Sequence, residues 1–251
     1  MYRYKIIFAY DGSDFAGFQV QPHQRTVEKT LKIAVNKIAK NPDPAIEVYG
    51  SGRTDAGVHA LGQVAHFDIP FDLPDDSMRR ALNSLLPLDM MVKSAEHVDA
   101  NFHARYSAHR KLYRYRVSQG EFVDPFKRRY TAHYKYPLDI ERMQIAVKDL
   151  IGEHDFTSLV ASGSQTKSNV RIIYHAQIWR DEHDQEIIFE FEGNGFLYNQ
   201  VRIMVSLLLE IGNDQRPVND IPRVLAARDR NQARGTAPAS GLYLVEVNYD
   251  D

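Results

Sequence analysis

Two successive series of strand-like and helix-like segments run along this chain in nearly the same order, and that order restricts the folds it can adopt. The first series opens with Tyr2–Tyr10, which is rich in the aromatic and β-branched residues that strands prefer. Apolar residues at helical spacing follow in Val27–Ile38, after Thr26 as a candidate N-cap. We predict the other elements of this half as strands at 46–51, 63–69 and 90–96 and a helix from Ser77 to about 86.

The second half repeats the order of elements without repeating residues. Its predicted strands are 112–118, 129–136, 170–180, 186–192 and 242–249, and its predicted helices are 139–152, 197–211 and 220–227. Both halves approach the order β-α-β-β-α-β, which is typical of ferredoxin-like units. We therefore predict an α+β fold with two ferredoxin-like units, 1–104 and 105–251, a largely antiparallel sheet and a catalytic cleft between the units.

The composition excludes several kinds of site. The 251 residues include no cysteine, which removes disulfides, thiolate zinc sites, iron–sulfur clusters and cysteine nucleophiles. The longest nearly apolar stretch, 203–211, contains Ser206 and Glu210 and is far too short to span a membrane. The N-terminus shows no apolar segment of secretory length. We therefore expect a cytoplasmic protein that does not enter membranes.

Positive charge is concentrated in residues 102–136, which we call the basic segment. It has nine Arg or Lys residues against Glu121 and Asp124, a net charge of +7 in a chain whose formal charge is −2. Nine aromatic residues are interleaved with these cations. Such a mixture is typical of a nucleic-acid surface, where cations meet phosphates and rings meet bases. A pair of strands with a polar outer face and tyrosines inside would give the same pattern, so both interpretations stand.

The most unusual stretch is residues 50–60, GSGRTDAGVHA, between two predicted strands. Its three glycines permit positive φ angles or the close approach of a ligand. Loops held by strands often carry catalytic side chains, and Arg53, Asp55 and His59 are the candidates here. The alternative is structural, with an Asx-turn at Asp55 and a surface position for Arg53.

Arg202 lies in the predicted helix 197–211, which is apolar on nearly every side. Such a helix is usually buried, and a buried arginine needs a partner because an unpaired buried charge is very costly. Asp55 is one candidate for that partner. The alternative places Arg202 on a solvent-facing edge of the helix, beside Tyr198 and Asn199.

The sequence lacks the common metal and nucleotide-cofactor motifs. His59, His66 and His103 form no H-E-x-x-H pattern, and there is no Walker A run or G-x-S-x-G elbow. Residues 193–198, GNGFLY, lack the third glycine of a dinucleotide fingerprint. We therefore expect neither a metal nor a cofactor.

Several motifs in a fixed order resemble one known family. Residues 52–59, GRTDAGVH, closely resemble the active-site motif of the TruA family of tRNA pseudouridine synthases. The Arg202 helix and five further segments resemble the family in its order, so the resemblance extends over essentially the whole chain. These segments are 10–19, 102–108, 113–115, 155–158 and 241–245. Phe18 stands where many relatives carry Trp, a difference that concerns local packing or RNA contact.

The resemblance implies an activity and a set of roles. The family converts uridine to pseudouridine at positions 38, 39 and 40 in the anticodon stem-loop of tRNA, without metal or cofactor, and forms homodimers. By this likeness Asp55 is the catalytic carboxylate, Tyr113 stacks on the target base, and Arg202 is the basic partner of Asp55. The other predicted substrate contacts are Arg53, His59, Arg110, Lys127, Arg128 and Arg129.

The chemistry of the reaction suits these residue types. Isomerisation breaks the N1–C1′ bond, turns the uracil and rejoins it through C5, so a carboxylate such as Asp55 has an electron-poor carbon to attack. Whether Asp55 attacks C1′, attacks the base or removes a proton stays open. Other interpretations are a non-catalytic RNA-binding module, a pseudouridine synthase with shifted RNA targets, and a hydrolase of a small acidic substrate that uses Asp55 and His59.

Overall fold

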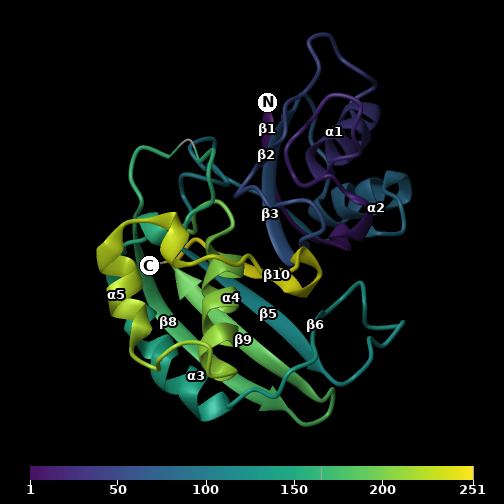
Figure 1. Cartoon of the computed structure of the whole chain (residues 1–251). Coiled ribbons are helices and arrows are strands. Elements are labelled where there is room, and N and C mark those ends of the chain that lie inside the picture. Colours follow the sequence, from purple (N-terminus) through teal and green to yellow (C-terminus); the bar gives the residue numbers. More distant parts are fainter. Residues whose placement is uncertain (165, 251) are drawn as a thin grey trace. The chain divides into compact units, whose positions relative to one another are not determined.

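The computed structural model describes residues 1–164 and 166–250 and divides the chain into two compact units. Unit 1 consists of Met1–His109 and Leu244–Asp251, and unit 2 of Arg110–Tyr243. Each unit contains helices and strands, and in each the strands pair mostly antiparallel (Figure 1). The predicted α+β class with a largely antiparallel sheet is therefore confirmed.

The sheet of unit 1 is built around β1 (Tyr2–Tyr10). This strand pairs antiparallel with β3 (His59–Ile69) on one side and with β4 (Met90–His97) on the other. Alternate residues of β1 from Tyr4 onward are buried, as expected of a strand with one face on a core. Tyr4, Phe8 and Tyr10 of this segment are therefore part of the core of unit 1.

The strand predicted at 46–51 is much shorter in the structure. Only β2 (Tyr49–Gly50) pairs with β3. The side chain of Asn36 accepts a hydrogen bond from the Ile46 N–H (2.7 Å) and donates one to the Ile46 carbonyl (3.0 Å). Because this backbone is satisfied by a side chain, it needs no strand neighbour. The part of β10 (Leu242–Asn248) that belongs to unit 1 also lies next to β3.

Two helices complete unit 1. α1 (Val27–Ile38) has its predicted bounds and follows Thr26, whose side chain makes no capping bond. α2 (Asp75–Leu85) begins before the predicted cap, so Ser77 lies inside the helix. Pro74 precedes α2 with a φ of −53°, and two aspartates occupy the first turn, where carboxylates favour the positive end of the helix dipole. These two features replace the expected serine cap.

Unit 2 contains four antiparallel strands in the order β5-β9-β8-β7. Their bounds are β5 Arg110–Gln119, β9 Glu186–Gly193, β8 Val170–Asp181 and β7 Gly152–Asp155. β6 (Ala132–Tyr134) is shorter than the predicted strand 129–136 and pairs parallel with the end of β5. Tyr115 and Phe189 lie opposite each other in β5 and β9 and are fully buried, so the core of unit 2 lies against this face.

The first helical stretch of unit 2 ends earlier than predicted. Asp139 caps α3 (Ile140–Ala146) as expected, and its side chain accepts the Arg142 N–H at 3.1 Å. The chain then tightens into a 3-10 turn (Val147–Leu150) and enters β7, a strand that the sequence analysis missed. The other short 3-10 turns are Gly12–Asp14, Thr157–Leu159, Arg230–Gln232 and Ala239–Gly241.

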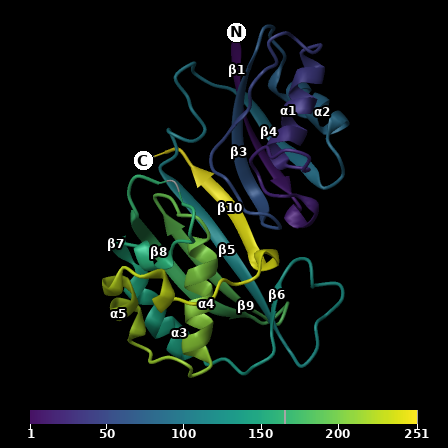
Figure 2. The same cartoon turned by 45° about the horizontal axis from the view of Figure 1, so that its top comes forward.

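α4 (Gln200–Gly212) and α5 (Asp220–Ala227) are the later helices of unit 2. α5 has its predicted bounds, whereas α4 begins three residues after the predicted start at Leu197. Asn199 stands directly before α4 with a φ of 58°, a left-handed conformation that a helix does not continue through. Figure 2 shows α3 and α4 lying side by side over the strands of unit 2.

Within the described part of the chain, every helix is too short or too polar to cross a membrane.

Candidate functional site

The loop that carries Asp55 is held in place mainly by backbone atoms. We call residues 51–58 the Asp55 loop. The Phe18 N–H donates to the Thr54 carbonyl (3.0 Å), and the Gly57 N–H donates to the Phe15 carbonyl (3.3 Å). The Asp55 carbonyl accepts the Val58 N–H at 3.2 Å, while the Asp55 residue itself is half-buried. The carboxylate is therefore carried by a braced turn without being sealed in the core.

Side chains of the neighbouring strands β1 and β3 form hydrogen bonds with the same loop. The Tyr10 hydroxyl and Thr54 Oγ1 lie 2.7 Å apart, and burial raises the pKa of Tyr10 to about 12. Ser51 Oγ donates to Gln63 Oε1 (2.6 Å), and Gln63 Nε2 donates to the Gly52 carbonyl (3.1 Å). The first half of the loop is thus tied to β1 and β3 by these hydrogen bonds, and a satisfied network of this kind is rigid.

Two glycines let the segment 12–18 press against the Asp55 loop. A Cβ atom on Gly12 would lie 1.9 Å from the Val58 carbonyl oxygen. Gly17 has a φ of +97°, and a Cβ there would lie 2.9 Å from the Thr54 carbonyl oxygen. No other residue type fits these backbone contacts without displacing the loop.

The two other candidates of this motif have opposite surroundings. His59 is only 2% exposed, and its Nδ1 accepts the Gly12 N–H at 3.1 Å and lies 3.2 Å from Asp11 Oδ1. It therefore joins the segment 12–18 to β3. Arg53 is exposed and has no hydrogen bond or ion pair with another described residue. Of the two, Arg53 is the side chain that is accessible to a ligand.

In unit 2, Arg202 is half-buried on a helix that is otherwise buried on nearly every side, as predicted. Its Nε donates to the Ala237 carbonyl (2.7 Å) and its Nη1 donates to the Asn199 side chain (2.7 Å). The Ala237 N–H in turn donates to the Arg202 carbonyl (3.1 Å). The guanidinium is thus oriented by its own unit, and its pairing with Asp55 of unit 1 stays a prediction.

Tyr113 lies on the inner face of β5. It is 8% exposed, and its ring forms a T-shaped contact with Phe196, with centroids 5.1 Å apart and planes at 79°. Phe191 of β9 lies opposite it in the strand register. Aromatic neighbours hold the ring in one orientation, and its stacking on a target base stays a prediction.

The arginines of β5 are paired with carboxylates of the adjacent strand β9. Arg114 contacts Glu190 at 2.7 Å, and Arg110 lies 3.9 Å from Glu192. Tyr113 and Tyr115 alternate with these cations and are buried. For this part of the basic segment, the interpretation as a strand with a polar outer face is confirmed.

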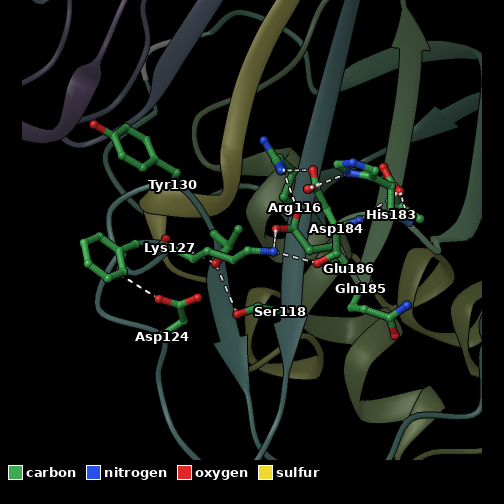
Figure 3. Close-up of polar contacts among 12 residues, drawn as sticks. Arg116, Ser118, Asp124, Lys127, Tyr130, His183, Asp184, Gln185 and Glu186 are labelled. Carbon is green, nitrogen blue, oxygen red and sulfur yellow. Dashed lines mark hydrogen bonds and ion pairs between the residues drawn. The ribbon is translucent and has the colours of Figure 1, made fainter.

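A third glutamate of β9 draws two cations together (Figure 3). Glu186 is fully buried, and its Oε2 accepts from Arg116 Nε at 2.7 Å while its Oε1 accepts from Lys127 Nζ at 3.0 Å. Lys127 Nζ also donates to the Asp184 carbonyl at 2.6 Å. Arg116 further bonds the Asp184 carboxylate at 3.0 Å. A buried carboxylate needs such partners, so Lys127 fastens its loop to the β8–β9 turn.

Comparison with known proteins assigns the family. The family model described as tRNA pseudouridine synthase matches residues 6–107 and 146–250. The chain belongs to the tRNA pseudouridine synthase family. It is an isomerase that makes pseudouridine, and tRNA is its substrate.

Proteins named tRNA pseudouridine synthase A are similar along the whole chain. That of Limosilactobacillus reuteri is 71% identical and covers 99% of this chain and 97% of its own. That of Limosilactobacillus fermentum is 67% identical, with 100% and 97% covered, and that of Ligilactobacillus salivarius is 61% identical, with 99% and 97% covered. A solved Cbf5-Nop10-Gar1 complex covers 82% of this chain and 54% of that chain at 11% identity and a TM-score of 0.35, too distant to support an argument.

Few cations of the basic segment of this tRNA pseudouridine synthase are left without an acidic partner. Arg128 is exposed, donates only to the Pro125 carbonyl, and forms no ion pair with a described residue. Lys135 is exposed too, and its Nζ lies 5.0 Å from the ring centroid of Tyr136. Arg129 is half-buried and has a contact within the protein. Arg128 is thus the best-placed of the predicted contacts in this loop to meet an RNA phosphate.

The sequence analysis of this family member missed the glutamates of β9. They stand in the segment EIIFEFEG, where glutamates at 186, 190 and 192 share one side of a strand by their even spacing. That spacing could have indicated a charged face on this strand, but it could not show that β5 would be the neighbouring strand. Among the described residues no group of three or more His, Asp or Glu side chains is arranged to hold a metal.

Proposed function

We propose that this enzyme isomerises the uridines at positions 38, 39 and 40 in the anticodon stem-loop of tRNA, with Asp55 as its catalytic carboxylate. The observation that carries the proposal is the Asp55 loop: its backbone is braced on both sides while the residue stays half-buried. Preorganised placement of a reacting group is what catalysis of this kind requires.

The reaction that Asp55 would serve exchanges the bond between ribose and uracil. The N1–C1′ bond breaks, the uracil turns, and C5 bonds to C1′; C5 then loses its proton to solvent and N1 takes up a proton, so the product is an isomer of uridine. In our proposal Arg202 keeps the carboxylate ionised through an ion pair. Tyr113 would support the detached base by stacking, which is worth roughly 1–3 kcal/mol. Arg53, exposed beside Asp55, would hold the nucleotide after it leaves its stack, a step that costs a few kcal/mol.

The remaining RNA contacts are proposed on the surface of each unit. Arg128 supports this best because it is exposed and has no acidic partner among the described residues. Arg110, Arg129 and Lys127 stay predicted contacts, with Lys127 serving at the same time as an anchor on Glu186. His59 would act indirectly, by positioning the segment 12–18.

We also propose that the enzyme is a homodimer in the cytoplasm. Phe122 and Phe126 support a partner chain, because they are 80% and 88% exposed in a loop of unit 2, and exposed apolar patches commonly mark interfaces. The ferredoxin-like description of two domains, 1–104 and 105–251, likewise stays a proposal. The element order β1-α1-β2-β3-α2-β4 of unit 1 supports it.

The test is release of tritium from tRNA labelled at C5 of uridine, because formation of the new bond expels that hydrogen. We expect Asp55→Asn to lower release by about 10³-fold or more while tRNA binding changes less than about threefold. Asp43→Asn, at an exposed position of the same unit, is the matched control and should keep full release.

Each outcome decides something. Near-normal release by Asp55→Asn would overturn the catalytic assignment. Release from the wild type at uridines other than 38, 39 and 40, located by mapping the product, would replace the proposed target with another tRNA site.

A further inference from the structure

Unit 1 carries a chain of four rings outside the Asp55 loop. Tyr49 stacks on His66 with centroids 5.1 Å apart and planes at 21°. His66 meets His103 at 4.6 Å, and His103 meets Tyr106 at 4.4 Å and 35°. The rings come from β2, from β3 and from the turn that follows β4. We call these four residues the ring cluster.

The inner part of the ring cluster is rigid and uncharged at neutral pH. His66 Nδ1 accepts the Ala104 N–H and His103 Nδ1 accepts the Arg105 N–H, both at 3.1 Å. Burial lowers the pKa of His66 to about 4 and lowers the pKa of His103 as well. Both imidazoles therefore present neutral faces whose orientation is set by the backbone.

The outer end of the ring cluster is open. Tyr106 is 77% exposed, although its ring lies close to the ring of His103. Burial of a core does not explain a tyrosine that remains in solvent. A preorganised ring with most of its surface free is what a stacking partner needs, since little conformational entropy is lost on binding.

A cation without an acidic partner stands next to this ring. The Arg105 guanidinium carbon lies 5.9 Å from the Tyr106 ring centroid, and Arg105 has no ion pair with a described residue. Arg3, which also contacts this turn, differs: it is paired with Asp68 and donates to the Phe102 carbonyl at 2.9 Å. Only Arg105 of the two is available to an external anion.

We propose that the ring cluster is a second RNA-binding site of this enzyme, in which an unpaired base of the tRNA stacks on Tyr106 and Arg105 meets an adjacent phosphate. Exposed aromatic rings beside free arginines recognise single-stranded nucleotides in this way. The proposal rests on tRNA being the substrate and is independent of the role of Asp55.

The experiment measures equilibrium binding of unmodified tRNA to the full chain at several salt concentrations. We expect Tyr106→Ala to weaken binding about tenfold and Tyr106→Phe to bind like the wild type, because stacking needs the ring and not the hydroxyl. Tyr2→Ala is the matched control: Tyr2 is also exposed and also touches a histidine ring in unit 1. It should leave binding unchanged.

Salt dependence separates stacking from phosphate contact. Tyr106→Ala should keep the slope of log K against log salt, whereas Arg105→Ala should reduce its magnitude by about one unit. Sedimentation velocity of each variant, and its thermal unfolding curve, show that the assembly and the fold are unchanged.

Three results would overturn the ring cluster as an RNA site. They are wild-type affinity in Tyr106→Ala, equal losses in Tyr106→Phe and Tyr106→Ala, and a change of oligomeric state in Tyr106→Ala, which would assign the surface to a second copy of the chain. An Asp55→Asn enzyme that retains turnover would leave this site standing and remove only the catalytic proposal. A wild type that binds no tRNA would remove both.

Discussion

The Asp55 loop and the basic segment both stood out in the sequence, yet the fold treats their side chains differently. In the Asp55 loop, backbone atoms make most of the holding contacts, so Arg53 stays exposed. In the basic segment, side chains make the contacts that hold the strand, since Arg114 and Arg116 form ion pairs with glutamates of β9. When a loop is held by its backbone atoms, its charged side chains remain available to a ligand. When a strand is held by ion pairs of its side chains, few of its charged side chains remain available.

This difference changes how a local excess of charge is interpreted. The basic segment has a net charge of +7 in the sequence, but the acidic partners come from residues 184–192, far along the chain. Arg116 is an example: burial lowers its pKa, but the hydrogen bond and the charge of Glu186 raise it and leave the net pKa above the usual value, so that the charge of Arg116 is stabilised within the protein. Charge counts over a segment therefore overestimate the charge that a tRNA meets.

The largest effect on stability is expected from Glu186→Ala. The change removes the two charge-assisted hydrogen bonds that the buried Glu186 carboxylate accepts from Arg116 and Lys127. Bonds of this kind contribute about 1.5–3 kcal/mol each, so we expect a loss of about 3 kcal/mol or more. Glu121→Gln, at an exposed position, should change the free energy of unfolding by less than about 0.5 kcal/mol. Urea unfolding at pH 7 measures both, and a loss below 1 kcal/mol in Glu186→Ala would show that these ion pairs are not structural.

Gly17→Ala tests the backbone contacts of the Asp55 loop. We expect a loss of about 3 kcal/mol from the positive φ and the contact with the Thr54 carbonyl, together with a fall in kcat. Gly163→Ala is matched in φ, at +88°, but has no atom within 4 Å, and should cost only about 1 kcal/mol. Equal losses in the two variants would mean that backbone strain, and not contact with the loop, decides the result.

The ring cluster of unit 1 should make the protein less stable in acid. The folded-state pKa of His66 is lowered to about 4, so the folded protein keeps this ring neutral while the unfolded chain takes up a proton near pH 6.5. Stability from His66 is thus complete above pH 6.5 and is lost as the pH falls toward 4. Between pH 7 and pH 5 we expect a loss of about 2 kcal/mol, measured by urea unfolding at both values.

His66→Gln identifies the group responsible for this loss. The variant removes the titrating ring, so its free energy of unfolding should fall much less over the same pH range. If the variant loses as much stability as the wild type, another group accounts for the pH dependence.

The smallest effect on stability, but a clear one on binding, is expected from Arg128→Ala. Arg128 has no acidic partner to lose, so unfolding should change by less than about 0.5 kcal/mol. The slope of log K against log salt for tRNA should drop in magnitude by about one unit if Arg128 meets one phosphate. Lys127→Ala is the comparison: it should destabilise the protein and change the slope less. If Lys127→Ala changed the slope and Arg128→Ala destabilised the protein, Lys127 would be the phosphate contact and Arg128 the structural anchor.

Much of the fold could be predicted because it depends on local patterns. The aromatic and β-branched residues of Tyr2–Tyr10 and the stripe in Val27–Ile38 produced the expected elements, and Asp139 caps a helix as expected, although that helix is shorter than predicted. The elements that were predicted wrongly depend on contacts with other segments of the chain. Asn36 satisfies the backbone of Ile46, and β7 forms only because β8 lies beside it.

By itself the sequence determined the α+β class, the family, and Asp55 as the candidate for catalysis, because these depend on residue types at fixed spacing. The tertiary structure decided which charges are free. Glu186 and Lys127 are 59 residues apart, and Arg3 and Asp68 are 65 apart. Ion pairs form between side chains that the sheet brings into contact, and no spacing along the chain states which strands will be neighbours. For the same reason the ring cluster, assembled from β2, β3 and a later turn, was visible only after folding.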